Sequence, residues 1–440
     1  MLKLYTPQDA LASLLRRIPL DDMAIPASLQ ESIARAFGAA LSPSEAVGVI
    51  LSEIRQNGDE AVRKWSAKLD GQGSESFRVS EERIKDALAQ LQPDDLTAFQ
   101  LAADRIRQFH RSQPVTSWIT QAMGGTLGQI VRPVRRVGIY VPAGSAPLPS
   151  SVLMTAIPAQ VAGVAEIVLV TPPQRESGSV SPAILAAAAL LGITEVYAIG
   201  GAQAIGALAY GTGSIKPVDK IFGPGNLFVT LAKRQVYGVV GIDSLAGPTE
   251  TVIVADEKAR PDWVAADLLA QAEHDILAAA ILLTPSAGLI EAVQVEIDEQ
   301  LKKRSRAKII QGSFENRSGA VLTTSLEQAI ELANLYAPEH LCLAVTDPWR
   351  WVDQVQAAGG VFLGEHSFEV LGDYVAGPSH VMPTSGSARF ASPLNVLDFV
   401  HIISLIALDS ATTHHIAPAA AALARCEGLD AHANAAEVRL

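Results

Sequence analysis

A carboxylate and an imidazole stand side by side in the stretch LYAPEHL, residues 335 to 341, among apolar neighbours. Burying a charged side chain is costly unless the charge is paired, so Glu339 and His340 need a reason to be there. Such a pair either is structural, with each group satisfied by a partner, or transfers protons. An imidazole titrates near neutral pH and is a frequent general base, so the second use makes this pair a candidate catalytic site.

A second set of residues has the chemistry of metal ligands. Gln271 and His274 are spaced i and i+3, which puts them on one face near the C-terminal end of a helix predicted from RPDWVAADLLAQAEHD. Asp373 follows in the glycine-rich stretch LGDYVAGPSH, and His432 lies close to the C-terminus in EGLDAHANA. Each residue alone is more readily structural, but together their nitrogen and oxygen donors suit Zn²⁺.

The last two of these stretches each contribute a further polar residue. His380 shares the loop of the aspartate, and Glu427 precedes the terminal histidine. Because the four donors include a single carboxylate, bound Zn²⁺ would keep a net positive charge. Such a site suits a neutral or anionic substrate that completes the coordination of the ion.

Glycine-rich loops follow three predicted strands and carry hydrogen-bonding side chains. The loops YVPAGSAP, GGAQAIG and FGPGN contain Tyr140, Gln203 and Asn226, and AGPTE adds Thr249 where a second set of strands begins. Ligands of open α/β sheets bind beside such loops, where glycine lets the backbone approach closely. None of the loops is a G-x-G-x-x-G dinucleotide motif, and the residues by themselves leave a turn role and a ligand role equally open.

The elements that must position these residues alternate between strand and helix. One alternating run begins near residue 135 and a second with TETVIVAD, which predicts βαβ units and parallel sheets. Residues 1 to 110 have helical patterns, with Ser42 as an N-cap and Glu45 completing a capping box. The chain from about residue 393 is alanine-rich and predicted to be helical. The predicted fold is α/β, with two Rossmann-like parallel-sheet lobes, incomplete and without GxGxxG, plus small helical N- and C-terminal segments.

Composition narrows the class of protein. The 440 residues are 49% hydrophobic and 18% charged, with a net charge of −12 and no basic run, which argues against nucleic acid as a partner. Two cysteines argue against a disulfide framework or a thiolate metal site. With no signal peptide and no apolar run long enough for a membrane span, we expect a soluble cytoplasmic enzyme.

A set of ordered motifs resembles the histidinol dehydrogenase family. From about residue 130 onward the matching stretches are RVGIYVPAGSAPLPSSVLM, GGAQAIGALAYGT, KIFGPGN, DSLAGPTE, DLLAQAEHD, YAPEHL, GDYVAGPSHVMPT and EGLDAHANA. The resemblance implies a zinc-containing, NAD-dependent oxidoreductase of histidine biosynthesis. It would oxidise L-histidinol through L-histidinaldehyde to L-histidine with two NAD⁺.

The resemblance also implies residue roles by match of position. Zinc would be held by Gln271, His274, Asp373 and His432. The NAD site would be lined by Tyr140, Gln203 and Asn226. Histidinol would be contacted by Thr249, Gln271, His274, His340, Asp373, Glu427 and His432. His340 would be the base for alcohol oxidation and Glu339 would activate water for the aldehyde step, while zinc orients the substrate.

Domain boundaries and assembly follow from the same resemblance. The expected units are a larger α/β domain with the catalytic pair (25–140 and 249–394), an NAD-binding domain (141–248), a small helical domain (1–24 and 395–419) and a C-terminal tail (420–440). The tail is expected to reach the partner subunit of a homodimer. Glu427 and His432 would then act in the partner's site.

The sequence departs from the family pattern at two positions and leaves other functions open. Thr249 stands where the family usually has Ser, and Ser379 where many members have Asn. Cys342 could form a thiol adduct with an aldehyde, although a small buried strand residue is the better interpretation. The alternatives are a zinc- and NAD-dependent dehydrogenase of another amino alcohol or hydroxylated substrate, a non-catalytic α/β binding protein, and a zinc hydrolase without nicotinamide.

Overall fold

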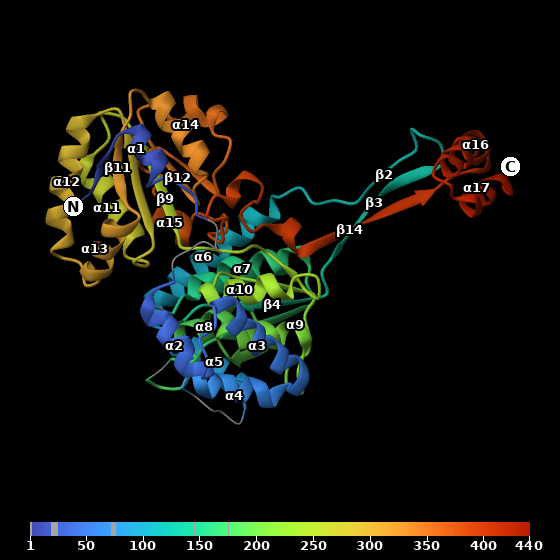
Figure 1. Cartoon of the computed structure of the whole chain (residues 1–440), viewed down its shortest axis with the longest axis horizontal. Helices are drawn as coiled ribbons and strands as arrows, with labels where there is room; N and C mark the ends of the chain where they lie inside the picture. The colour runs from blue at the N-terminus through green and yellow to red at the C-terminus, as the bar shows by residue number, and fades with distance from the viewer. Residues whose placement is uncertain (1, 19–24, 72–75, 144–146, 175) are drawn as a thin grey trace.

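The computed structural model describes residues 2–18, 25–71, 76–143, 147–174 and 176–440. Two α/β lobes lie side by side, and a long arm carries the C-terminus away from both (Figure 1). Residues 144–146 of the first glycine loop and residues 19–24 of the expected N-terminal segment lie outside the described residues. Within the described residues, no helix combines the length and hydropathy needed to cross a bilayer.

The first lobe contains a five-stranded parallel sheet of order β6-β5-β4-β7-β8. Its strands are β4 (Arg136–Tyr140), β5 (Glu166–Thr171), β6 (Val196–Ala198), β7 (Lys220–Phe222) and β8 (Gly241–Ile242). The connecting helices are α7 (Pro149–Ala162), α8 (Pro182–Leu190), α9 (Gly201–Tyr210) and α10 (Leu227–Val236). The predicted alternation of strand and helix is confirmed here.

The second lobe contains a six-stranded parallel sheet of order β1-β11-β10-β9-β12-β13. Its strands are β1 (Leu4–Tyr5), β9 (Glu250–Ala255), β10 (Ala279–Thr284), β11 (Gly319–Leu322), β12 (His340–Ala344) and β13 (Gly360–Leu363). Its helices are α1 (Pro7–Ala12), α11 (Pro261–Ala272), α12 (Ala287–Leu301), α13 (Ala307–Asn316), α14 (Leu326–Tyr336) and α15 (Glu369–Tyr374). Strands covered by helices on both faces have near-continuous apolar sequences, as β9 and β10 do.

Five helices near the N-terminus belong to the first lobe rather than to the second. They are α2 (Ala27–Phe37), α3 (Pro43–Asn57), α4 (Asp59–Leu69), α5 (Glu81–Ala89) and α6 (Pro93–Arg111). The predicted capping box of Ser42 and Glu45 begins α3. Ile50 and Ile54 of α3 and Trp65 of α4 pack into the same buried cluster as Val168 and Ile205 of the first sheet and its helix α9.

The predicted division into domains therefore differs from the packing. Residues 25–140 were expected to join 249–394, but their apolar helix faces and β4 complete the core of the first lobe. The first residues of the chain add a strand to the second lobe through β1, so they do not form a helical unit with residues 395–419. The two ends of the chain lie at opposite ends of the molecule (Figure 1).

The arm is an antiparallel sheet of order β14-β3-β2, built from β2 (Trp118–Thr120), β3 (Thr126–Pro133) and β14 (Val400–Ala407). It ends in α16 (Ser410–Cys426) and α17 (Asp430–Glu437). The expectation that the chain is helical from about residue 393 is wrong for β14. Its β-branched residues pair along their whole length with β3, a partner more than 260 positions away that local composition could not reveal.

Candidate active site

The pair Glu339–His340 lies at the amino end of β12, where the chain leaves α14. Helix α14 ends at Tyr336. Its C-cap Ala337 has a left-handed conformation with φ 50, and Pro338 prevents the helix from continuing. His340 is in register with Thr251 of β9 and Gly360 of β13, so the pair lies between the beginnings of these two neighbouring strands. This site occupies the amino edge of a parallel sheet, whereas the carboxyl edge is the usual place for ligands.

Glu339 is buried and held by hydrogen bonds to one of its oxygens. Thr249 Oγ1 donates to Oε2 at 2.6 Å, and the backbone N of Glu250 donates to the same atom at 3.0 Å. Burial raises the pKa of Glu339 to about 7, even though His340 and these two hydrogen bonds lower it. A carboxyl whose pKa lies near neutral pH can both release and accept a proton under physiological conditions.

His340 is surrounded by acceptors. Its Nδ1 lies 3.3 Å from the carbonyl oxygen of Glu250, 3.7 Å from Glu369 Oε1 and 3.8 Å from Glu339 Oε2. Its Nε2 lies 3.8 Å from Asp373 Oδ1 and has no hydrogen-bond partner among the described residues. If Nδ1 carries the proton, it donates to the Glu250 carbonyl oxygen and the lone pair of the ring lies on Nε2. A general base has this arrangement.

Three of the four predicted metal ligands lie around this pair. Gln271 is fully buried at the end of α11, and its Nε2 donates to Thr249 Oγ1 at 3.0 Å. Helix α11 ends at Ala272, so His274 follows the helix rather than belonging to it. Burial lowers the pKa of His274, while the charge of Asp373 raises it. These side chains, spread over more than 100 residues of sequence, are brought together by the order of the strands.

Gln271 Oε1 carries an observation that bears on a metal. It is buried and has no hydrogen-bond partner among the described residues. Buried amide oxygens are usually satisfied by a partner, so this oxygen is available to coordinate a cation. No group of three or more His, Cys, Asp or Glu residues in the described part of the chain forms a complete metal site.

The structure adds acidic and basic neighbours that sequence reasoning missed or left aside. Glu369, the first residue of α15, is buried and accepts a hydrogen bond from Thr251 Oγ1. Burial raises its pKa well above the usual value, and Asp373 raises it further. His380 Nδ1 lies 2.8 Å from the Asp373 carbonyl oxygen. The one available signal for Glu369 was its spacing of four residues before Asp373, which places both on one face of a helix.

Glu427 and His432 are not near the other predicted site residues within this chain. They lie in α16–α17 at the far end of the arm, distant from β12 and α11 (Figure 1). Cys342 is buried in β12, and burial raises the pKa of its thiol well above the usual value. The interpretation of Cys342 as a small buried strand residue is confirmed.

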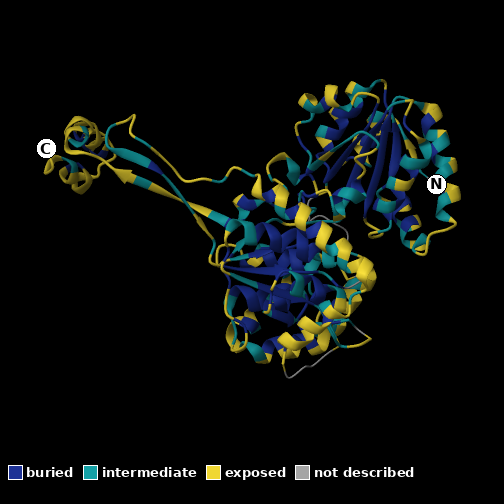
Figure 2. Ribbon diagram, turned by 180° about the vertical axis from the view of Figure 1, so that it is seen from behind, coloured by how far each residue is buried: buried dark blue, intermediate teal, exposed yellow. Residues whose placement is uncertain are grey.

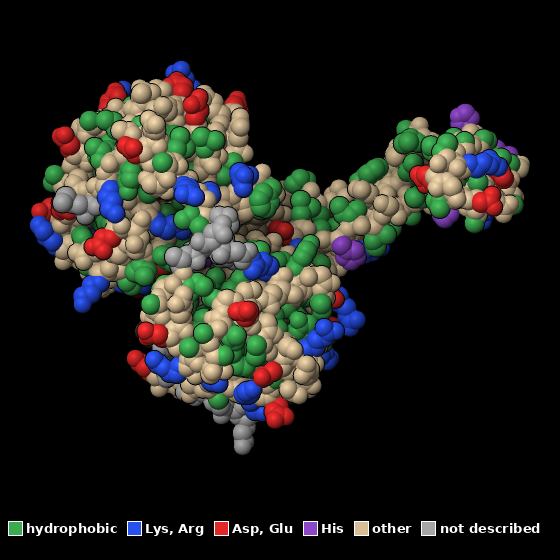
Figure 3. Space-filling model, viewed as in Figure 1, with side chains coloured by type: hydrophobic (Ala, Val, Ile, Leu, Met, Phe, Trp, Pro, Cys, Tyr) green, Lys and Arg blue, Asp and Glu red, His purple; other side chains and the backbone are tan. Residues whose placement is uncertain are grey.

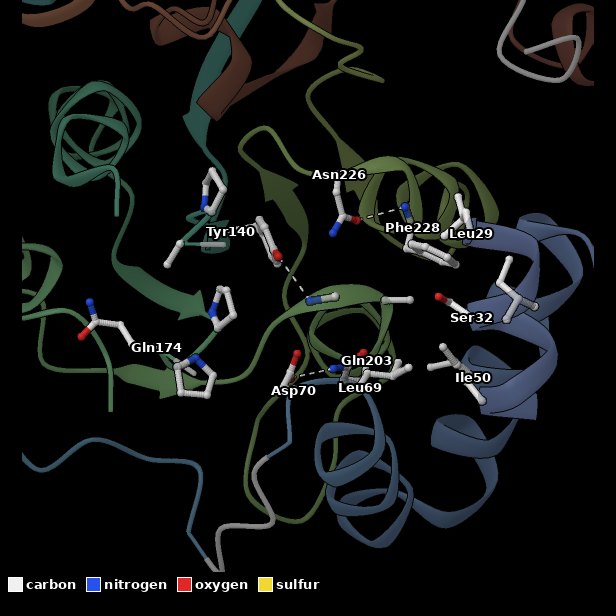
Figure 4. Close-up of a pocket in the computed structure, with 18 of the residues that line it drawn as sticks. Leu29, Ser32, Ile50, Leu69, Asp70, Tyr140, Gln174, Gln203, Asn226 and Phe228 are labelled. Atoms are coloured by element: carbon white, nitrogen blue, oxygen red, sulfur yellow. Dashed lines mark hydrogen bonds between the residues drawn. The ribbon is translucent and has the colours of Figure 1, made fainter. Parts of the chain in front are cut away.

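The three loop residues of the first lobe do come together, around a cavity of about 1030 Å³ (Figure 4). The Tyr140 hydroxyl accepts a hydrogen bond from Gly201 N at 3.2 Å, and burial raises its pKa to about 12. Gln203 Nε2 donates to Asp70 Oδ2 at 3.0 Å. Asn226 caps α10 by accepting from Phe228 N at 3.0 Å, so its turn role is real. Such a cavity has the volume of a site for a cofactor-sized ligand.

The opposite wall of the cavity comes from the N-terminal helices, which no motif predicted. Leu29 and Ser32 of α2 and Ile50 of α3 face the strand-end loops across it (Figure 4). Their contribution was not visible in the sequence because α2 shows only an ordinary amphipathic pattern. The position of α2 against the first lobe is a tertiary contact that no local pattern reports.

Two parallel α/β lobes, one with a cofactor-sized cavity and the other with a buried acid–base pair beside metal-type donors, place the chain among two-lobed α/β enzymes. A sequence model described as histidinol dehydrogenase matches residues 38–440. The histidinol dehydrogenase of Deinococcus radiodurans is 53% identical over 421 residues, which cover 94% of this chain and 95% of that protein. That of Moorella thermoacetica is 54% identical over 393 residues, covering 89% and 92%.

A solved structure agrees with the sequence relatives. The crystal structure of histidinol dehydrogenase from Elizabethkingia anophelis has a TM-score of 0.90 and 37% identity, and the alignment covers 100% of this chain and 98% of that one. The chain belongs to the histidinol dehydrogenase family, a family of oxidoreductases.

Proposed function

We propose that this chain is an NAD- and zinc-dependent L-histidinol dehydrogenase that oxidises L-histidinol to L-histidine by way of L-histidinaldehyde. Family membership supports the substrate. The observation that carries the chemistry is the buried Glu339–His340 pair with a partnerless Nε2 facing Asp373. The complete reaction consumes one water and two NAD⁺ and yields two NADH and three protons.

Zinc fits the residues that the resemblance assigns to it. The partnerless Oε1 of Gln271, the imidazole of His274 and the carboxylate of Asp373 are donors that Zn²⁺ accepts. When bound there, the ion would hold the imidazole and amine of histidinol and so orient the reacting carbon. His432 would be the fourth protein ligand.

His340 is proposed to remove the hydroxyl proton in the first oxidation. The Glu250 carbonyl would keep the proton of the imidazole on Nδ1, so that Nε2 is free to accept. Removal of the hydroxyl proton lets the carbon release a hydride, and NAD⁺ supplies the acceptor for it. The aldehyde would stay bound because the same side chains hold it for the second oxidation.

Glu339 is proposed to act in the second oxidation. Water must add to the aldehyde before a second hydride can leave, and a base next to the aldehyde carbon speeds that addition. Glu339 is adjacent to His340, and its pKa of about 7 suits proton exchange with water near neutral pH. Two bases side by side would thus serve two successive oxidations at one site.

The cavity of the first lobe is the proposed NAD site. Tyr140, Gln203 and Asn226 line it and present polar atoms at strand-end loops. Gly201 begins α9 and Asn226 precedes α10, so two helix N-termini open toward the cavity, where they would favour the pyrophosphate.

The arm supports the proposal of a homodimer in which Glu427 and His432 complete the partner's site. Apolar side chains on β14 are exposed in the single chain: Ile402 by 55%, Ile403 by 46% and Ile406 by 72%. Hydrophobic side chains recur along the arm in Figure 3. A protein rarely leaves such a surface in water, and an arm of this length can carry its helices to a second copy.

The test is NADH formation from L-histidinol before and after treatment with EDTA, followed by addition of Zn²⁺. We expect about two NADH per histidinol, loss of the activity on chelation and recovery with zinc. Activity that survives complete zinc removal would contradict the metal assignment. Oxidation of a different amino alcohol, with histidinol left unchanged, would favour the alternative substrate.

A further inference from the structure

Arg17 connects the N-terminal segment to the end of α14. Its Nε donates to the Tyr336 carbonyl oxygen at 2.8 Å, and its Nη2 donates to the Ala337 carbonyl oxygen at 3.2 Å. The guanidinium carbon lies 3.5 Å from the centroid of the Tyr336 ring. The last carbonyls of a helix have no partner within the helix, so Arg17 satisfies the end of α14 directly before Glu339 and His340.

The same guanidinium makes a two-point ion pair with Glu250. Arg17 Nη1 pairs with Oε1, and Nη2 donates to Oε2 at 2.8 Å. The Glu250 side chain is 0% exposed, so its negative charge must be stabilised by neighbouring groups rather than by water. Ser385 N donates to Oε2 at 3.2 Å, and Arg317 Nη2 lies 3.7 Å from Oε1.

Glu250 touches the catalytic pair through its backbone. Its N–H donates to Glu339 Oε2 at 3.0 Å, and its carbonyl oxygen lies 3.3 Å from His340 Nδ1. The side chain of Glu250 therefore anchors the peptide that holds both bases. The guanidinium of Arg17 binds this side chain of Glu250 and also binds the turn at Ala337 that precedes the two bases.

We infer that Arg17 is a positioning residue for Glu339 and His340, acting through Glu250 and through the C-terminus of α14. The inference rests on the proposed function of that pair. Arg17 precedes residues 38–440, which match the family model. Among the described residues, Arg17 is not part of the cavity lining of the first lobe and has no hydrogen bond to a predicted metal ligand, so its contacts are separate from the proposed cofactor and metal sites.

Arginine has a geometry that few side chains can replace here. Its planar fork satisfies a carboxylate at two points while its remaining N–H groups reach two carbonyls and its face stacks on Tyr336. A lysine at this position would keep the charge but could not make all of these contacts at once. A methionine would keep the apolar stem over the ring and remove the charge.

The experiment compares Arg17→Met, Arg17→Lys and the control Arg16→Met in the full-length protein. Arg16 is the exposed neighbour on the same segment. We expect Arg17→Met to lower kcat for both oxidations about tenfold or more, with KM for NAD⁺ within about twofold of wild type. The kcat of Arg17→Lys should lie between those of Arg17→Met and wild type, and the kcat of Arg16→Met should match wild type.

A double variant separates positioning from mere stability. If Arg17 acts by neutralising Glu250, then Glu250→Gln in the Arg17→Met background should recover part of the lost kcat, because the uncompensated buried charge is gone. Melting temperatures of the four proteins of this cycle should show the same coupling. Equal kcat in Arg17→Met and wild type, or a purely additive cycle in both readouts, would overturn the inference.

The outcomes also separate this inference from the proposed function. A wild-type protein that does not oxidise histidinol refutes the function, while the coupling in melting temperature still tests the Arg17–Glu250 contact. An active wild type with an unaffected Arg17→Met variant refutes the positioning role alone. If Arg17→Met fails to fold, Arg17→Lys carries the test, and a wild-type kcat in that variant would contradict the role of the fork.

Discussion

At the scale of single residues, the site depends on how burial and neighbours set proton affinities. Glu339 and Glu369 are both buried, and burial raises the pKa of each. Burial raises the pKa of Glu339 to about 7, although the charge of His340 and the hydrogen bonds from Thr249 and the Glu250 N–H favour its ionised form. For Glu369, the acidic neighbour Asp373 raises the pKa further. Both carboxyls therefore keep a proton more readily than a solvent-exposed carboxyl does.

Glu339→Gln should impair the aldehyde oxidation more than the alcohol oxidation, because the amide cannot accept a proton from water. As a base Glu339 must be ionised, and its pKa of about 7 lies above the usual value. The aldehyde step of the wild type should therefore slow as pH falls below about 7, by about tenfold per unit. Single-turnover NADH formation from histidinaldehyde across pH measures this.

The matched control is Glu331→Gln, an exposed carboxylate on α14. It should leave both steps and their pH dependence as in the wild type. An equal loss of both oxidations in Glu339→Gln would show that the two bases do not divide the work in this way.

At the scale of elements, the start of β12 is a close contact between backbones. Gly359 immediately precedes β13, and its N–H donates to the Pro338 carbonyl oxygen at 2.9 Å. A Cβ added at Gly359 would lie 2.5 Å from the Glu339 carbonyl oxygen and 3.0 Å from Met382 Cβ. Neither neighbour is a free side-chain end that could move aside, so the glycine lets β13 approach the proposed catalytic pair.

Gly359→Ala should destabilise the protein by about 1–3 kcal/mol and reduce kcat, because the added methyl displaces the backbone of Glu339. Gly288→Ala is the control, since a Cβ there meets open space in α12 and alanine favours the helix. Chemical denaturation and steady-state kinetics of both variants give the comparison. A Gly359→Ala variant with wild-type stability and kcat would show that the backbones of Gly359 and Glu339 leave enough space for a methyl group.

At the scale of the whole molecule, the proposed role of the arm bears on whether one chain is sufficient for catalysis. Figure 2 shows the arm exposed on most of its surface, unlike the two lobes with their buried sheets. Glu427 and His432 stand at its end. In the proposed dimer each site would combine the lobe residues of one subunit with the tail residues of its partner.

Mixed dimers test this arrangement. His340→Asn removes the proposed base of the second lobe, and His432→Asn removes the proposed zinc ligand of the tail. Each variant alone should therefore be inactive. Random reassociation of the two should restore about a quarter of wild-type activity, because half the dimers are mixed and each mixed dimer has one intact site. Wild-type homodimers carried through the same reassociation are the control, and no restoration would place the tail in the site of its own chain.

Much of the architecture was predictable because its causes are local. The period of apolar residues indicated the strands and helices of both lobes, and Ser42 with Glu45 predicted the start of α3. The adjacent Glu339 and His340, and the ordered motifs around Gln271 and Asp373, were visible as residue types at particular spacings. The strand β14 was missed because its pairing partner β3 is remote and the alanine-rich residues after it favour a helix.

The sequence by itself determined most element types, the family and the candidate bases, since these depend on neighbours along the chain. Tertiary structure decided which groups surround the bases. Arg17 and Glu250 are separated by 233 positions, and Thr251 and Glu369 by 118. The sheet order puts β9 between β10 and β12, so the start of β9 lies against the start of β12, and side chains from distant segments are buried together there. Burial of charge against a remote partner has no signature in local periodicity, which is why Arg17, Glu250 and Glu369 emerged only from the folded chain.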